Sequence, residues 1–292
     1  MSESAPLAPG LYLVATPIGN LEDITLRALR VLRSCDRIAC EDTRQTQKLL
    51  NHFGIETRTV SYHLHNEQSR AEELIADLRN GARIAVVSDA GTPGIADPGV
   101  EVVQAAIAAG ISVYPIPGAS AALSALIASG LDTEQFTFRG FLPSKSGERK
   151  SLLEIVKTEM SNGHRATQIF YETPHRIADA LADIEAIFSA SHRITLAREL
   201  TKLHEEFLRG TVVSVRAEIE KREAVRGEMV LLLSGDLDAS TQNASEKQSI
   251  ADEIRSLMER DHLDEKEALK RVAKNRSLGK SEVYREWQRS KR

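Results

Sequence analysis

The stretch Ala85-Val-Val-Ser-Asp-Ala-Gly-Thr-Pro-Gly-Ile-Ala-Asp-Pro-Gly99 decides the fold of this chain. It begins as an apolar strand and continues as a loop rich in glycine, proline and aspartate. Such a loop at the carboxyl end of a buried parallel strand is where open α/β sheets bind their ligands. Glycine lets backbone groups approach a ligand closely, and proline fixes the loop before binding. A tight strand-to-helix connection collects the same residue types, so this loop alone leaves both interpretations open.

Short apolar strands and longer helical patterns alternate around this loop, which is typical of an α/β fold. In the first half the pattern predicts strands at 11–15, 37–40, 83–88 and 111–115, and helices at 23–34, 43–53, 66–80 and 99–109. Helix 23–34 is expected to place Ile24, Leu26, Leu29 and Leu32 near one face, and Asn66 is expected to cap helix 66–80.

The second half resembles a different sheet, entered through an Ala-rich helix at 120–129. Its predicted strands are 136–142, 166–171, 193–198, 210–213 and 228–234. We therefore expect an α/β chain with two α/β domains at 10–116 and 117–236, followed by a linker and a basic helical tail at 237–292.

The tail is the basic part of an otherwise acidic chain. Residues 270–292 carry nine Lys or Arg against two Glu, whereas the whole chain has a net charge of −4. Helical spacing at Ile250, Ile254 and Leu257, then at Leu269 and beyond, and a turn at 278–281 that Ser281 would cap, resemble a helix-turn-helix. We favour contact with phosphates; a solvated helical pair or a dimer contact is the alternative.

Composition narrows the function classes. Aromatic residues are 4% of the chain, which disfavours a broad stacking platform for single-stranded nucleic acid. Cys35 and Cys40 have no third or fourth ligand nearby, so we expect two reduced thiols and no metal site. With no signal sequence and no apolar run of membrane-spanning length visible, we expect a cytoplasmic protein without a membrane contact.

Several motifs together resemble one known family. Leu13-Val-Ala-Thr-Pro-Ile-Gly-Asn20, the 88–99 loop and Pro117-Gly-Ala-Ser-Ala121 occur in the order seen in the tetrapyrrole methylase superfamily. Further motifs are similar to its ribosomal RNA small subunit methyltransferase I branch: Thr16-Pro-Ile-Gly-Asn-Leu-Glu-Asp-Ile-Thr25, Glu41-Asp-Thr-Arg44, Gly140-Phe-Leu-Pro143, Tyr171-Glu-Thr-Pro-His-Arg176 and Arg198-Glu-Leu-Thr-Lys202. The first loop has fewer glycines than is usual in the superfamily, and Gly91-Thr-Pro93 replaces its Gly-Asp-Pro.

The resemblance implies a homodimer of two-domain chains that hold S-adenosyl-L-methionine in the cleft between the domains. It implies methylation of the ribose 2′-hydroxyl of a cytidine in the decoding region of 16S rRNA, with the RNA held in the small ribosomal subunit or a precursor particle. The cofactor contacts expected by resemblance are Pro17, Asp89, Ala90, Gly91, Thr92, Ile95, Ala96, Ser120, Ala121, Tyr171 and Met229.

Transfer to a hydroxyl needs a base or a cation within hydrogen-bond reach. We select Lys202 as the group nearest the hydroxyl, because the 198–202 motif follows a strand and combines both charges; an internal ion-pair network is the alternative. Arg139 and Lys150 are expected in a basic loop at the mouth of the cleft, and the residues expected to contact RNA are Arg44, Lys145, Arg149 and Arg198.

Two other functions stay open from the residues alone. One is a tetrapyrrole methyltransferase acting on a corrin or porphyrin precursor, against which the basic tail and the basic 139–150 segment argue. The other is a non-catalytic RNA-binding protein that uses its tail and has no affinity for S-adenosylmethionine.

Overall fold

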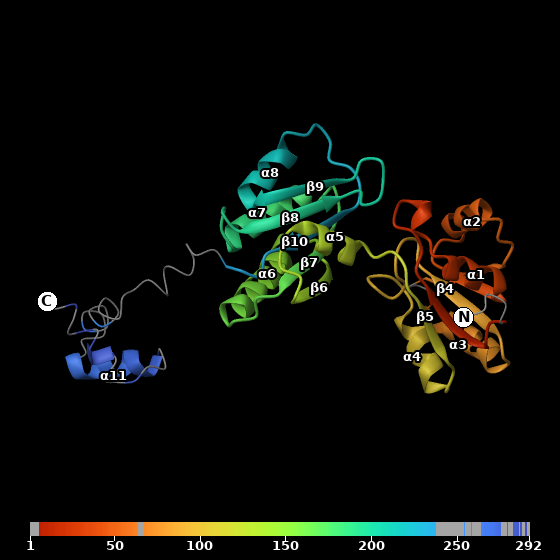
Figure 1. Cartoon of the computed structure of the whole chain (residues 1–292), viewed down its shortest axis with the longest axis horizontal. Helices are drawn as coiled ribbons and strands as arrows, with labels where there is room; N and C mark the ends of the chain where they lie inside the picture. Colours follow the sequence, from red (N-terminus) through yellow and green to blue (C-terminus); the bar gives the residue numbers. More distant parts are fainter. Residues whose placement is uncertain are drawn as a thin grey trace. The chain divides into compact units, whose positions relative to one another are not determined.

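A computed structural model describes residues 6–63 and 67–237, together with residues 254, 258, 264–275, 279, 283–285, 287 and 290 near the C-terminus. The chain divides into two compact units, Met1–Asp236 and Leu237–Arg292 (Figure 1). Among the described residues, no helix combines the length and the apolar character needed to cross a membrane. The predicted domain bounds of 10–116, 117–236 and 237–292 stay predictions.

The first sheet is parallel throughout, in the order β3-β2-β4-β1-β5. Its strands are β1 (Gly10–Val14), β2 (Arg37–Cys40), β3 (Thr59–Ser61), β4 (Arg83–Val87) and β5 (Val113–Ile116). They are joined by η1 (Leu21–Asp23), α1 (Leu26–Ser34), α2 (Thr43–His52), α3 (Glu67–Arg79) and α4 (Val100–Ala108). Both faces are buried: Ala85 and Val87 pack into one apolar cluster, while Ile84 and Val86 pack into another.

The order of the strands creates a crevice at the ends of β1 and β4. These strands are neighbours, yet the chain continues from β1 toward β2 on one side and from β4 toward β5 on the other. The loops that leave them diverge there, which is where doubly wound sheets bind ligands. The backbones of Thr16 and Gly91 join the two loops through hydrogen bonds of 2.9 and 3.1 Å.

The second sheet is mixed, in the order β6-β7-β10-β8-β9. Its strands are β6 (Phe136–Phe141), β7 (Thr167–Glu172), β8 (Arg193–Arg198), β9 (Glu206–Thr211) and β10 (Met229–Leu233). Only β6 and β7 pair in parallel within the described sheet; β10 is antiparallel to β7 and to β8, and β9 is antiparallel to β8. The helices are α5 (Ala121–Ser129), α6 (Ser146–Ser161), α7 (Ile177–Ile187) and α8 (Val212–Glu220).

The predicted α/β class with two α/β domains is confirmed, and strand 37–40 has the predicted bounds. Two predictions were wrong in detail, and one strand was missed. The first helix begins at Leu26, after the Thr25 cap, and turns Leu26 outward with 81% exposure, while Ala28 and Val31 are buried instead. Strand 210–213 ends at Thr211, because a capping box between Thr211 and Ser214 starts α8. The short strand β3 was not predicted.

The two cysteines are buried free thiols. Burial raises the pKa of Cys35 to about 11, so this thiol stays protonated at neutral pH.

In the C-terminal unit, helix α11 (Glu265–Asn275) packs Ala268 and Val272 into a small cluster with Ile254, Val283 and Trp287. The predicted linker beyond Leu237 and the predicted roles of Asn66, Ile250, Leu257 and Ser281 lie outside the described residues.

Candidate active site

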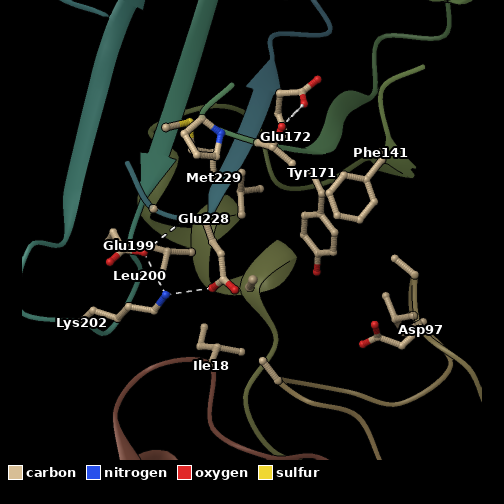
Figure 2. Close-up of a pocket in the computed structure, with 18 residues that line it drawn as sticks. Ile18, Asp97, Phe141, Tyr171, Glu172, Glu199, Leu200, Lys202, Glu228 and Met229 are labelled. Carbon is tan, nitrogen blue, oxygen red and sulfur yellow. Dashed lines mark hydrogen bonds and ion pairs between the residues drawn. The ribbon is translucent and has the colours of Figure 1, made fainter. Parts of the chain in front are cut away.

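A cavity of about 540 Å³ lies where the loops of the first sheet meet the second sheet (Figure 2). The first sheet contributes Ile18 and the 90–97 segment, and the second contributes the ends of β7 and β10 and the loop after β8. Its apolar lining includes Ile18, Ile95, Phe141, Tyr171, Leu200, Met229 and Val230, and its ionisable lining is Asp97, Glu172, Glu199, Lys202 and Glu228. Four of these five ionisable groups are acidic, so the cavity suits a ligand with apolar or aromatic parts and positive charge.

Tyr171 lies at the centre of the aromatic part of the cavity lining. Its ring makes edge contacts with Phe138 and Phe141, at centroid distances of 4.9 and 5.6 Å. Figure 2 shows Tyr171 and Phe141 side by side above Asp97. Burial raises the pKa of the Tyr171 hydroxyl, which keeps it neutral. The two rings are inclined at 67° to each other, so they form an apolar corner in which one ring can stack on a planar ligand group.

Asp97 is a carboxylate of the cavity whose surroundings disfavour its charged form. Burial raises its pKa, the negative charges of Glu41 and Asp89 raise it further, and a hydrogen bond from Ser88 opposes them; the result is a pKa of about 6. A cation beside Asp97 would stabilise the ionised carboxylate and so offset the cost of its burial and of its repulsion by Glu41 and Asp89.

Lys202 lies between two carboxylates. Its Nζ is 2.8 Å from Oε1 of Glu199 and 2.9 Å from Oε2 of Glu228 (Figure 2). Burial alone would lower the pKa of Lys202, but the hydrogen bonds to the two glutamates outweigh it and raise the pKa. The same bond from Lys202 lowers the pKa of Glu199. Lys202 is therefore a protonated hydrogen-bond donor and not a base at neutral pH.

The backbone around Lys202 is strained and closely packed. Glu199 and Thr201 have left-handed φ angles of 52° and 65°, which non-glycine residues rarely adopt. A Cβ on Gly227 would lie 2.3 Å from Cγ of Glu199, and one on Gly19 would lie 2.5 Å from Cγ of Lys202. Such strain persists only where the surrounding structure enforces it, and it clusters at functional sites.

Glu172 ends β7 at the edge of the cavity, with its side chain fully buried. Its Oε1 accepts hydrogen bonds from the backbone N–H of Thr173 at 2.7 Å and from Nε of Arg176 at 2.8 Å. Its Oε2 has no hydrogen-bond partner within the described part of the chain. That oxygen is a buried acceptor, for which an enclosed water is the natural partner.

The cofactor residues expected from the sequence fall into three groups. Ala90, Ile95, Ala96, Ala121, Tyr171 and Met229 line the cavity together with Lys202. Pro17 and Asp89 line a second, smaller cavity beside it, where Oδ1 of Asp89 also accepts a hydrogen bond from the backbone of Asp42 at 3.1 Å. Gly91, Thr92 and Ser120 support the loops: Gly91 pairs with Thr16, the Thr92 hydroxyl donates to the carbonyl of Ala119, and Ser120 precedes α5.

One of the four expected RNA contacts is corrected by the structure. Arg149 lies in α6, not in a loop, and is only 3% exposed because it pairs with Asp183 at 2.6 Å. Arg198 is largely buried, pairs with Glu206 at 3.0 Å and donates to the carbonyl of Arg226. Arg149 is therefore too buried to contact RNA, whereas Arg198 keeps 17% of its side chain exposed and its contact with RNA stays a prediction.

Arg44 and Lys145 are exposed, as RNA contact requires; Arg44 pairs with Asp42, and Lys145 with Glu148. The predicted basic loop at 139–150 is wrong, because most of this segment belongs to β6 and α6. Arg139 lies in β6 and bonds Gln168 and Glu159. Lys150 lies in α6 and pairs with Asp183.

Sequence reasoning did not assign a role to Asp97, although Asp97 lines the cavity, and it did not predict the contact between Glu228 and Lys202. Asp97 lies in the same 85–99 stretch as Asp89, so the sequence could have indicated Asp97 as a second carboxylate at the site. Glu228 contacts Lys202 from 26 residues away, which no local pattern reveals.

Comparison with known proteins agrees with this architecture. The family model described as "Tetrapyrrole (Corrin/Porphyrin) Methylases" matches residues 10–215. Two relatives, both named "Ribosomal RNA small subunit methyltransferase I", come from Halalkalibacterium halodurans, at 47% identity over 94% of this chain and 93% of that protein, and from Bacillus subtilis, at 43% identity over 94% and 92%.

Among solved structures, diphthine synthase has a TM-score of 0.60 at 16% identity, over 78% of this chain and 91% of that one. Uroporphyrin-III-C-methyltransferase from Thermus thermophilus has a TM-score of 0.53 at 20% identity, over 80% and 98%. These two likenesses concern the fold. The sequence matches establish that this chain belongs to the tetrapyrrole methylase family and, within it, to the ribosomal RNA small subunit methyltransferase I family.

Proposed function

We propose that this chain is an S-adenosylmethionine-dependent methyltransferase that methylates the ribose 2′-hydroxyl of a cytidine in the decoding region of 16S rRNA. The observation that carries the proposal is the acidic, aromatic cavity that brings Asp97, Tyr171 and Lys202 together at the switch point of the first sheet. The names of relatives that cover almost the whole chain support ribosomal RNA as the substrate rather than a tetrapyrrole.

The residues present fit S-adenosylmethionine. Tyr171 and Phe141 offer a surface for the adenine, and Asp97 is a carboxylate that gains from a nearby cation. When bound, S-adenosylmethionine would supply a methyl group on a positively charged sulfur, which becomes neutral once the methyl is transferred.

We assign Lys202 the role of holding and polarising the ribose hydroxyl. As a protonated ammonium it donates a hydrogen bond to the hydroxyl oxygen, and it is held in place by Glu199. Glu228, whose side chain is 75% exposed, lies beside it as an acceptor for the hydroxyl proton. The protein thus contributes mainly position and electrostatics.

We propose a cytoplasmic homodimer that acts on the small ribosomal subunit or a precursor particle. The exposed apolar side chains of Leu123 and Ile127, one turn apart on α5, support a dimer contact. Arg44 and Lys145 are proposed as RNA contacts of the first unit, and exposed Lys270 and Arg271 of α11 as contacts of the tail.

The test is transfer of labelled methyl from S-adenosylmethionine to small-subunit particles that lack the modification. We expect label in a dinucleotide that resists alkaline hydrolysis, because methylation removes the 2′-hydroxyl that attacks the neighbouring phosphate. Label released as a methylated base, or a labelled corrin precursor in place of labelled RNA, would contradict the proposal.

A further inference from the structure

A second cavity, of about 280 Å³, adjoins the first one. Ile18, Ala90, Lys202 and Glu228 line both cavities and so form a common wall. The Lys202–Glu228 ion pair, 2.9 Å long, is therefore accessible from either side. A group in one cavity and a group in the other would meet at this wall.

The chemistry of the second cavity differs from that of the first. It lacks the aromatic rings of the first cavity and is instead bordered by the 16–19 loop and by Gln45, Lys48 and Leu49 of α2. Gln45 carries an amide that can both donate and accept hydrogen bonds. Such a group suits a base edge or a ribose hydroxyl better than it suits a sulfonium.

Lys48 supplies a cation that no carboxylate neutralises among the described residues. Its Nζ donates to Oε1 of Gln45 at 2.8 Å, and its side chain is exposed. Arg44 lies four residues earlier on α2, so both side chains occupy the same face of the helix. Two exposed cations one turn apart, beside a polar cavity, fit a strand of nucleic acid whose phosphates follow the helix.

We infer that the second cavity receives the acceptor nucleotide of the RNA strand, with Lys48 contacting its phosphate and Gln45 its ribose or base. The inference rests on the proposed function, because it places the methyl donor in the first cavity. Lys202 and Glu228 then stand between donor and acceptor, where the hydroxyl must approach the methyl group.

The close packing at Gly19 supports this arrangement. Because a Cβ there would lie 2.5 Å from Cγ of Lys202 and 2.8 Å from Oγ1 of Thr201, the 16–19 loop lies directly against the Lys202 segment. The backbone N–H of Asn20 also donates to Oγ1 of Thr201 at 3.0 Å. The wall between the cavities is thus fixed by both sheets.

The experiment compares Lys48→Ala and Gln45→Ala in the full-length protein with two matched controls. Gln47→Ala removes an exposed amide of the same helix that bonds only Asn51 among the described residues, and Lys221→Ala removes an exposed cation that pairs with Glu218 on α8. Calorimetry gives the dissociation constant of S-adenosylmethionine. Methyl transfer to small-subunit particles over a range of salt concentrations gives KM and kcat.

We expect Lys48→Ala to raise KM for the particles about tenfold. It should also reduce the slope of log(1/KM) against log salt concentration by about 0.7, the value for one phosphate contact on a single strand. Gln45→Ala should raise KM without changing that slope. Neither change should alter the affinity for S-adenosylmethionine, and both controls should behave as wild type.

Unchanged KM and slope in Lys48→Ala and Gln45→Ala would overturn the inference and leave the proposed function intact, provided that the wild type binds and transfers methyl. Weakened S-adenosylmethionine binding in either variant would also overturn it, because the second cavity would then hold part of the donor. A wild type that does not bind S-adenosylmethionine would remove the proposed function and the inference together.

Discussion

Nζ of Lys202 lies 2.9 Å from Oε2 of Glu228, a residue 26 positions further along the chain. This contact joins the loop after β8 to the residue that precedes β10, and it lies where the two cavities meet. With Glu199 on its other side, the ammonium is fixed and protonated. The reacting hydroxyl would therefore find a preorganised donor, which costs no reorganisation during the reaction.

Replacing Lys202 by Met keeps the length of the side chain and removes the charge. We expect kcat to fall by about 10²-fold, the lower end of the range for a positioned proton-handling group. Binding of S-adenosylmethionine should persist, and single-turnover transfer to small-subunit particles measures the loss. An unchanged single-turnover rate would show that Lys202 belongs only to a structural ion-pair network.

Gly227 holds Glu199, and through it Lys202, in position. In Gly227→Ala the new Cβ would lie 2.3 Å from Cγ of Glu199, at a backbone φ of 92°. We expect a lower kcat in a folded protein, because the displaced Glu199 no longer fixes the ammonium. Gly147→Ala in α6 is the matched control, since its Cβ would meet nothing within 4 Å. Equal kcat values for the two variants would refute this positioning role.

The affinity for S-adenosylmethionine should depend on the charge of Asp97. The pKa of Asp97 is raised to about 6, so the group is mostly neutral one unit below that value and mostly ionised one unit above it. A cationic ligand prefers the ionised form, so affinity should rise with pH, by roughly tenfold between pH 5 and pH 7.

The variant Asp97→Asn should flatten this pH profile, as measured by calorimetric titration. S-adenosylhomocysteine, whose sulfur is neutral, is the control ligand and should show a weaker dependence. If both ligands follow the same pH profile in the wild type, Asp97 does not respond to the sulfonium.

The buried pair of Arg149 and Asp183 should stabilise the fold. Arg149→Ala leaves the Asp183 carboxylate without its main partner in the interior, and we expect a loss of about 3 kcal/mol in the free energy of unfolding. Lys145→Ala, which removes an exposed cation from the residue that precedes α6, should change it by less than about 0.5 kcal/mol. Urea unfolding measures both.

The same pair should make stability depend on acid. Burial alone would raise the pKa of Asp183, but hydrogen bonds from Arg149 and Ser146 outweigh it and lower the pKa. The stabilisation is therefore present above the ordinary pKa of an aspartate and is lost as the pH falls through the lowered value. Urea midpoints that fall in parallel for wild type and Arg149→Ala below pH 4 would contradict this assignment.

The sequence predicted the parts of the site that local patterns encode. The glycine and proline loop after β4 indicated the ligand-binding edge of the first sheet. The alternation of strands and helices along the chain predicts a parallel sheet, and such sheets bind ligands at the loops that follow their strands. The roles of Arg149 and Arg198 were not predictable, because their partners Asp183 and Glu206 come from other elements of the fold. A run of charged residues in the sequence does not show which of the side chains is buried in an ion pair. The start of α8 was missed because Val212 and Val213 resemble a strand, while the capping box depends on the hydroxyls of Thr211 and Ser214.

The most direct measurement is calorimetric titration of S-adenosylmethionine into the wild type, Ala121→Phe and Asp89→Ala. Ala121 is the first residue of α5 and lines the cavity, so a phenyl ring there would fill space that the ligand needs. We predict one site per chain in the wild type and no binding in Ala121→Phe, with circular dichroism unchanged. Asp89 lines the adjoining cavity and accepts a hydrogen bond from the backbone of Asp42, so Asp89→Ala should weaken binding less, and only by loosening the loop that carries Asp97. A wild type that does not bind, or an Ala121→Phe variant that binds as the wild type does, would contradict a donor site in this cavity.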